Sequence, residues 1–121
     1  MHVQFAELPV RDQARATRFY VGNFGCEVVA DTPMGSGGWR WIELKFPGSE
    51  TTLHLTRAKP EATSDGPVLV LVDDDVAASV AALRSKGVEI LLEPHFPRWQ
   101  PGRTVAEFRD SEGNRMVIGS R

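Results

Sequence analysis

The chain has 121 residues and a mass of 13.4 kDa, which is the size of a single small domain. Hydrophobic residues make up 41% of it and charged residues 25%, a composition that excludes disordered and fibrous proteins. The formal net charge is -2 and the pI is about 5.9, so the chain lacks the basic surface of a nucleic-acid-binding protein. Cys26 is a lone cysteine and cannot form an internal disulfide.

The sequence does not open with the basic and then apolar pattern of a signal peptide. No apolar run approaches the ~20 residues that a membrane span needs. We therefore expect a cytosolic protein with no membrane partner.

The first elements are predicted by apolar periodicity and by residues typical of helix ends. A strand-like run, Gln4–Val10, precedes a helical segment that we expect to begin at the N-cap Asp12 and to end at Gly25. One face of this segment carries, at helical spacing, Ala16, Phe19, Tyr20, Asn23 and Phe24. A strand-like run over Cys26–Val29 follows. The glycine-rich Asp31–Gly38 is interpreted as a connector or flap, because a phosphate loop would lead into a helix.

Two further strands, Trp39–Leu44 and Thr51–Thr56, complete the first half, and residues 57–66 form a polar linker. The second half repeats this order. A strand over Pro67–Val72 leads into a helix that is capped from Asp73–Asp75 and ends at Gly87.

The remaining strands of the second half are Val88–Leu91, Thr104–Phe108 and Met116–Ile118, and the last two flank a turn at residues 110–114. Val10 and Gly25 recur 62 residues later as Val72 and Gly87, which indicates two copies of one module. Two short helices cannot bury both apolar faces on each other alone, so they must cover a sheet. We therefore predict an α+β fold whose uncovered sheet face curves around a cleft.

The motifs that carry a family resemblance are Leu8–Asp12, Arg18–Tyr20, Asn23–Gly25, Val70–Asp73 and Phe108–Asn114. A duplicated βαβββ module with these motifs resembles the vicinal-oxygen-chelate superfamily, which contains glyoxalase I, extradiol dioxygenases and bleomycin-resistance proteins. The resemblance covers residues 1–121 as one domain, with module one at about 1–56 and module two at 67–121. It implies helices on the outer face and a homodimer, in some relatives with exchange of a strand or module across the linker.

The resemblance places the four metal-ligand positions of the family's enzymes at Phe5, His54, Pro67 and Val117. Only His54 has a side chain that binds metals, whereas a catalytic divalent metal needs three or more protein ligands. We therefore expect no metal and no other cofactor. Conventional metal-dependent glyoxalase or dioxygenase activity is not expected.

His54 is the main candidate polar residue of the cleft. Its neighbours Leu53 and Leu55 point the other way, so the imidazole should face the cleft. It either bonds a neighbouring strand or contacts a ligand, in an enzyme as the group that transfers a proton.

The candidate aromatic residues are Trp39 and Trp41, which alternate onto one strand face, and Phe96 and Trp99 in a proline-rich loop. The tryptophans form either core, a dimer contact or the wall of a pocket. The loop either borders the site or plugs the end of the sheet with Trp99. The full predicted ligand-binding set is Phe5, Trp39, Trp41, His54, Phe96, Trp99 and Arg103.

These features favour a metal-free protein that binds a flat, partly apolar small molecule, such as an antibiotic that it sequesters. The ligand is expected between the Trp39/Trp41 strand and the Phe96–Trp99 loop. One alternative is an enzyme of lyase or isomerase type with His54 as its catalytic residue. A second polar group would then come from Glu7, Glu43 or Glu107. Another alternative is an interaction module whose cleft has no ligand.

Overall fold

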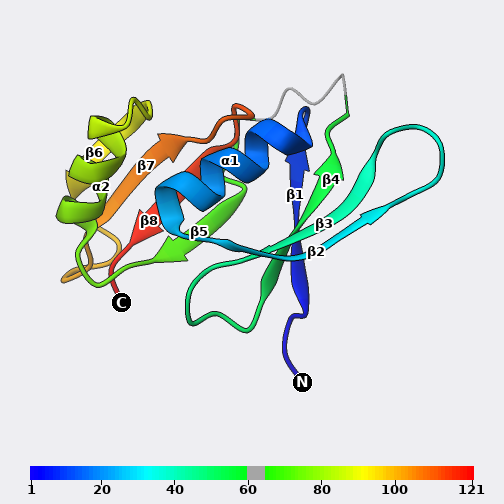
Figure 1. Ribbon diagram of the computed structural model, residues 1–121. Coiled ribbons are helices and arrows are strands. Elements are labelled where there is room, and N and C mark those ends of the chain that lie inside the picture. Colours follow the sequence, from blue (N-terminus) through cyan, green and yellow to red (C-terminus); the bar gives the residue numbers. More distant parts are fainter. Residues whose placement is uncertain (60–64) are drawn as a thin grey trace. The chain divides into compact units, whose positions relative to one another are not determined.

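The computed structural model describes residues 1–59 and 65–121 and divides into two compact units, Met1–Thr63 and Ser64–Arg121. Each unit has one helix and one sheet (Figure 1). The predicted linker at 57–66 spans this division, but its residues 60–64 lie outside the described part. Neither helix in the described residues is long and apolar enough to cross a membrane.

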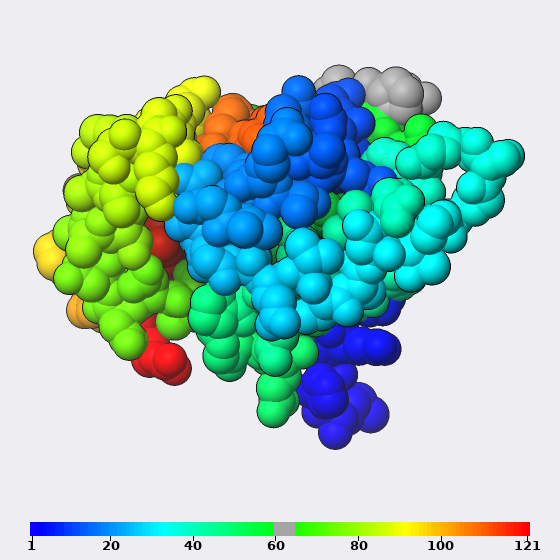
Figure 2. All heavy atoms as spheres, viewed as in Figure 1, coloured from blue at the N-terminus to red at the C-terminus, as the bar shows by residue number. Residues whose placement is uncertain are grey.

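The first unit contains β1 (Phe5–Val10), α1 (Gln13–Phe24), β2 (Glu27–Pro33), β3 (Arg40–Lys45) and β4 (Thr52–Arg57). Its strands lie in the order β1-β4-β3-β2. β1 is parallel to β4, and the other pairs are antiparallel. The tip of the β2–β3 hairpin stands out from the surface in Figure 2, where it is cyan.

The second unit contains β5 (Leu69–Val72), α2 (Val76–Ser85), β6 (Ile90–His95), β7 (Val105–Arg109) and β8 (Arg115–Gly119). Its strand order, β5-β8-β7-β6, and its single parallel pair, β5 with β8, repeat those of the first unit. The predicted α+β class and the two βαβββ modules are therefore confirmed.

Both helices begin where the sequence indicates. The Asp12 carboxylate accepts a hydrogen bond from the Arg15 backbone N–H at 3.0 Å, and Asp75 accepts one from Ala78 at 3.0 Å. Gly25 ends α1 with a φ of 67°, a conformation that glycine adopts without strain.

Each helix covers one face of its own sheet with apolar side chains. α1 buries Ala16 and Tyr20. The strand residues buried in the same unit are Leu8, Val10, Ile42, Leu44, Leu53 and Leu55. α2 packs against β6 and β7 and buries Val76, Val80 and Leu83. The strand residues buried in the second unit are Ala106, Phe108, Met116 and Ile118.

Two strands are longer than predicted. β2 continues through Asp31 to Pro33, which pairs with Arg40, and β6 continues through Pro94 to His95, which pairs with Val105. The register of each strand shifts along its length, so these irregular sequences pair with their neighbours despite a broken alternation. Residues that composition alone assigns to loops are therefore strand residues.

Candidate functional site

His54 lies in the middle of the first sheet, between two glutamates. It pairs with Glu7 of β1 on one side and with Glu43 of β3 on the other. Residues directly opposite each other in a sheet share a face, so the three side chains lie together. Leu53 and Leu55 alternate onto the other face and are buried in the core.

The His54 ring is enclosed by aromatic rings. It stacks on Trp41 with ring centroids 3.7 Å apart and an angle of 26° between the planes. The Phe5 ring lies edge-on at 5.4 Å from His54 and 5.8 Å from Trp41. Phe5, Trp41 and His54, all predicted site residues, therefore form one group, which we call the His54 cluster. The His54 side chain is only 9% exposed.

One nitrogen of His54 is paired and the other is not. Nδ1 lies 2.8 Å from a carboxylate oxygen of Glu7, which is itself half exposed. Nε2 is buried and has no hydrogen-bond partner in the described residues. A buried polar atom without a partner carries a penalty of about 1–3 kcal/mol, which a bound group that pairs with this atom would remove.

Glu43 is fixed by two donors on the same face. Its carboxylate accepts hydrogen bonds from the Trp41 indole N–H at 2.8 Å and from the Thr52 hydroxyl at 2.7 Å. These bonds, the Trp41 bond above all, lower the pKa of Glu43 below its ordinary value of 4.5, and the charge of His54 adds to them. The carboxylate thereby holds the indole that stacks on His54.

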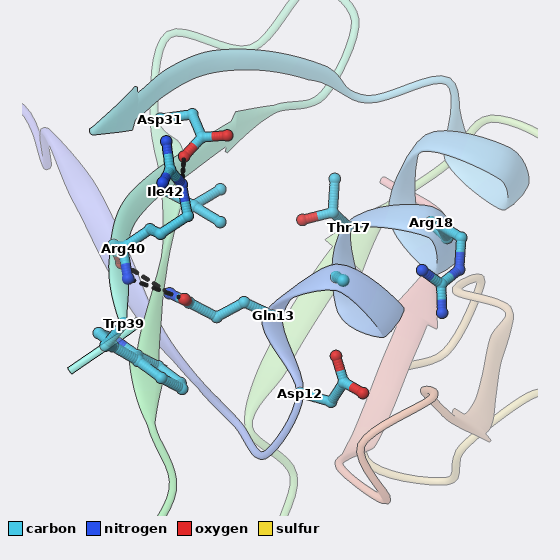
Figure 3. Close-up of a pocket in the computed structure, with 10 residues that line it drawn as sticks. Asp12, Gln13, Thr17, Arg18, Asp31, Trp39, Arg40 and Ile42 are labelled. Atoms are coloured by element: carbon cyan, nitrogen blue, oxygen red, sulfur yellow. Dashed lines mark hydrogen bonds and ion pairs between the residues drawn. The ribbon is translucent and has the colours of Figure 1, made fainter. Parts of the chain in front are cut away.

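Trp39 does not join the His54 cluster. β3 begins only at Arg40, and Gly38 has a φ of 80°, so the chain is not extended immediately before Trp39. The Arg57 guanidinium lies over the Trp39 ring, 4.4 Å from the ring centroid. Trp39 lines a cavity of about 530 Å³ together with Ile42 (Figure 3). Ile42 is buried and directly follows Trp41 in β3, so the two side chains lie on opposite faces of the strand. The predicted alternation of the two tryptophans on one face is therefore wrong.

The cavity lies between the start of α1 and the β2–β3 hairpin. Its lining residues are Asp12, Gln13, Ala14, Thr17, Arg18, Asp31, Gly38, Trp39, Arg40 and Ile42. The Gln13 amide donates to the carbonyls of Arg40 at 2.7 Å and Leu55 at 3.2 Å, and it accepts from the Arg40 N–H at 3.0 Å. Gln13 is not among the residues predicted from the sequence. One feature of the sequence points to it: Gln13 directly follows the N-cap of α1, and the equivalent residue of α2, Val76, is a buried apolar residue of the core.

The other predicted site residues belong to the second unit. Phe96 and Trp99 are 73% and 79% exposed, so Trp99 does not act as a buried plug. The Arg103 guanidinium donates to the Ser120 carbonyl at 2.9 Å and to the Gln100 side chain at 2.9 Å. Arg103 thus fastens the loop that follows β6 to the chain after β8.

Of the four ligand positions predicted from the resemblance, Phe5, His54, Pro67 and Val117, only His54 has a side chain that binds metals. The His54 side chain is hydrogen-bonded to Glu7, and Phe5 has no atom that could coordinate a metal. In the second unit Val117 pairs with Val70 in the same way as His54 pairs with Glu7 in the first, so Val70 is the counterpart of Glu7. Phe5 lies two residues before Glu7. Its counterpart is therefore Val68, two residues before Val70, and not Pro67. The described residues contain no group of three His, Cys, Asp or Glu side chains that could hold a metal ion.

Cys26 is the single thiol and lies in the core of the first unit at 4% exposure. Burial raises its pKa to about 11, because the thiolate would be poorly solvated there. A thiol that stays protonated at neutral pH is a poor nucleophile.

Comparisons with known proteins agree with this fold. A family model described as the Glyoxalase/Bleomycin resistance protein/Dioxygenase superfamily matches residues 2–118. The uncharacterized protein YetH of Bacillus subtilis (strain 168) is 31% identical over 114 residues, which are 90% of this chain and 89% of YetH.

Two solved structures extend the likeness to three dimensions. TnmS3, an antibiotic binding protein from Streptomyces sp. CB03234, is 32% identical with a TM-score of 0.81, over 99% of this chain and 95% of that chain. A superfamily member from Sphaerobacter thermophilus DSM 20745 is 25% identical with a TM-score of 0.85, over 100% of this chain and 98% of that chain. This chain therefore belongs to the Glyoxalase/Bleomycin resistance protein/Dioxygenase superfamily.

Proposed function

We propose that the protein binds a flat, partly apolar small molecule at the His54 cluster, as an antibiotic-sequestering protein would. The observation that carries the proposal is the His54 ring, which is held between Trp41 and Phe5 and whose Nε2 atom has no partner. The likeness to TnmS3, which is described as an antibiotic binding protein, supports the same ligand class.

The geometry also specifies the polar group that the ligand should present. A carboxylate only accepts hydrogen bonds, so the Glu7 contact places the proton of neutral His54 on Nδ1. Nε2 then carries a lone pair and accepts. The ligand should therefore offer a hydroxyl or an N–H group at the edge of an aromatic system.

The test is a thermal-shift screen of planar aromatic antibiotics, followed by affinity measurements. Burial of a tryptophan face contributes about 1–3 kcal/mol and a hydrogen bond about 0.5–1.5 kcal/mol. Trp41→Ala and His54→Ala should each weaken binding of a screened ligand about tenfold or more. Trp39→Ala is the matched control, because it removes the same residue type from the opposite face. Equal losses in all three variants, or none, would argue against the His54 cluster as the site.

A second candidate function is proton transfer in an enzyme. It is favoured by the Glu7–His54 contact, because a carboxylate that orients an imidazole is the usual support of a general base. A His54→Ala variant that keeps ligand affinity but loses a measured turnover would favour this function over simple binding.

Two further expectations complete the proposal. No transition metal should copurify in stoichiometric amount, which elemental analysis measures. The protein should be a homodimer, because each four-stranded sheet leaves edge strands such as β2 and β6 to be covered. Light scattering at micromolar concentration distinguishes a dimer from a monomer.

A further inference from the structure

The sheet face that carries the His54 cluster has two negative charges without a matching positive charge. Besides His54, strand pairing places four ionisable side chains of β1–β4 on this face, namely Glu7, Glu27, Glu43 and Lys45. Lys45 lies directly opposite Glu27, at the end of β3. Glu7 and Glu43 flank His54, and neither forms an ion pair with a lysine or arginine of residues 1–59 and 65–121. The two carboxylates beside His54 are therefore uncompensated.

The second unit shows the same register position with its charge neutralised. Glu107 of β7 is the counterpart of Glu43. Its carboxylate lies 2.5 Å from the Arg115 guanidinium. The position of Arg115 is taken in the first unit by Thr52, whose hydroxyl donates to Glu43 but brings no charge. A threonine in place of an arginine thus leaves the charge of Glu43 unbalanced.

Both carboxylates have room for further donors. A carboxylate has about four acceptor sites on its two oxygens. Glu7 uses one oxygen for His54 Nδ1 and is half exposed. Glu43 accepts one bond on each oxygen, from Trp41 and Thr52, and these bonds lower its pKa and keep it ionised at neutral pH. Because the Trp41 N–H and the proton on His54 Nδ1 are already used, the site offers a ligand acceptors and no donor from these groups.

The aromatic rings of the cluster favour a positive charge as well. The face of an aromatic ring carries negative potential and attracts cations, and tryptophan does so most strongly. The Trp41 N–H donates to the ionised Glu43 at 2.8 Å, and a hydrogen bond to an anion polarises the indole further in this direction. Phe5 adds a second ring next to Trp41.

We propose that the ligand of the His54 cluster is an aromatic cation, a planar ring system with an ammonium group at its edge. The ammonium lies near the carboxylates of Glu7 and Glu43 and donates to His54 Nε2. The ring system packs on Trp41 and Phe5. This inference rests on the function proposed above and adds the charge of the ligand to it.

The test uses three probes with the same naphthalene ring. 2-Naphthylmethylamine is a cation at neutral pH, 2-naphthalenemethanol is neutral, and 2-naphthoate is an anion. Affinities come from NMR titrations followed on the backbone amide signals of Glu7, Glu43 and His54. Because charge-assisted hydrogen bonds are stronger than neutral ones, the amine should bind about tenfold more tightly than the alcohol, and the naphthoate should bind most weakly. Added salt should reduce the preference for the amine.

Variants identify the source of the preference. Glu7→Gln and Glu43→Gln each remove one charge and keep the size of the side chain. Each should reduce the preference for the amine over the alcohol by about threefold or more. Glu50→Gln removes the same charge from the exposed loop between β3 and β4 and should preserve the preference.

The outcomes separate this inference from the proposed function. Equal affinities of the amine and the alcohol would overturn the inference alone, because the alcohol still offers the hydroxyl that the proposed function requires. A preference that persists in both glutamate variants, with unchanged circular dichroism, would also overturn it. Failure of all three probes to bind at the His54 cluster would contradict the proposed function and this inference together.

Discussion

Glu7 and His54 lie directly opposite each other in the parallel pairing of β1 with β4, and this register brings the Glu7 carboxylate within 2.8 Å of His54 Nδ1. The contact thus comes from strand pairing and needs no loop. Because the carboxylate can only accept, it selects the imidazole tautomer whose Nε2 atom carries the lone pair.

The first prediction concerns this tautomer. In the native protein, ¹⁵N NMR of the histidine ring should show neutral His54 protonated at Nδ1. Glu7→Ala should reduce that preference and lower the free energy of unfolding by about 0.5–1.5 kcal/mol, because Nδ1 loses its partner. Glu27→Ala, at an exposed position of β2, is the control. A native ring protonated mainly at Nε2 would contradict the prediction.

The second prediction concerns the pH dependence of stability through Glu43. Its pKa is lowered by the bonds from Trp41 and Thr52, so folding stabilises the ionised carboxylate. The stability contribution is therefore present above the ordinary pKa of 4.5 and is lost as the pH falls through the lowered folded-state pKa.

Urea unfolding as a function of pH tests this sign. The stability difference between the native protein and Glu43→Gln should be largest near neutral pH and should shrink in acid. Thr52→Val should show a smaller effect of the same sign, since it removes one of the two donors. A difference that grows on acidification would refute the assignment, and Glu50→Gln supplies an exposed control.

The elements of the fold were predictable because their signals are local. Asp12 and Gly25 mark the ends of α1 through cap chemistry, and alternation along β4 separates His54 from Leu53 and Leu55. The duplication was detectable for the same reason, since a glycine with positive φ follows each helix: Gly25 is the C-cap of α1, and Gly87 comes directly after Lys86, the C-cap of α2.

The contacts of the candidate site were less predictable because they depend on register between strands. Which glutamate meets His54 is decided by the offset of β1 against β4, and no local pattern encodes that offset. Trp39 does not share a face with Trp41 because β3 begins at Arg40, one residue later than the predicted strand. Arg103 is of a residue type that often contacts ligands, but its guanidinium donates a hydrogen bond to the Ser120 carbonyl, in the chain after β8.

The third prediction concerns Arg103 and Gly119. A Cβ atom at Gly119 would lie 2.6 Å from a terminal nitrogen of Arg103, so Gly119→Ala must displace the guanidinium from the Ser120 carbonyl. We expect Gly119→Ala and Arg103→Ala each to destabilise the protein by about 0.5–1.5 kcal/mol. In the Arg103→Ala background, Gly119→Ala should cost less, because the clash is gone. Additive costs in this double-mutant cycle would show that the two positions are independent.

The last prediction concerns Gln13, the buried polar residue at the start of α1. Its amide supplies both a donor and an acceptor to the backbone of Arg40 and a second donor contact to the Leu55 carbonyl. It therefore connects α1 to two strands of the sheet. Gln13→Ala would leave these backbone groups unsatisfied, and we expect the free energy of unfolding to fall by about 2–4 kcal/mol.

Gln13→Glu separates hydrogen bonding from the loss of packing, because the side chain keeps its size. The carboxylate can still accept from the Arg40 N–H, but it places a second acceptor against the carbonyls of Arg40 and Leu55. The variant should be destabilised near neutral pH and should recover stability relative to the native protein in acid, where the protonated carboxyl donates again. Gln4→Ala, at an exposed position, should change little. A Gln13→Glu penalty that does not change with pH in urea unfolding would mean that packing, and not the amide donor, joins α1 to the sheet.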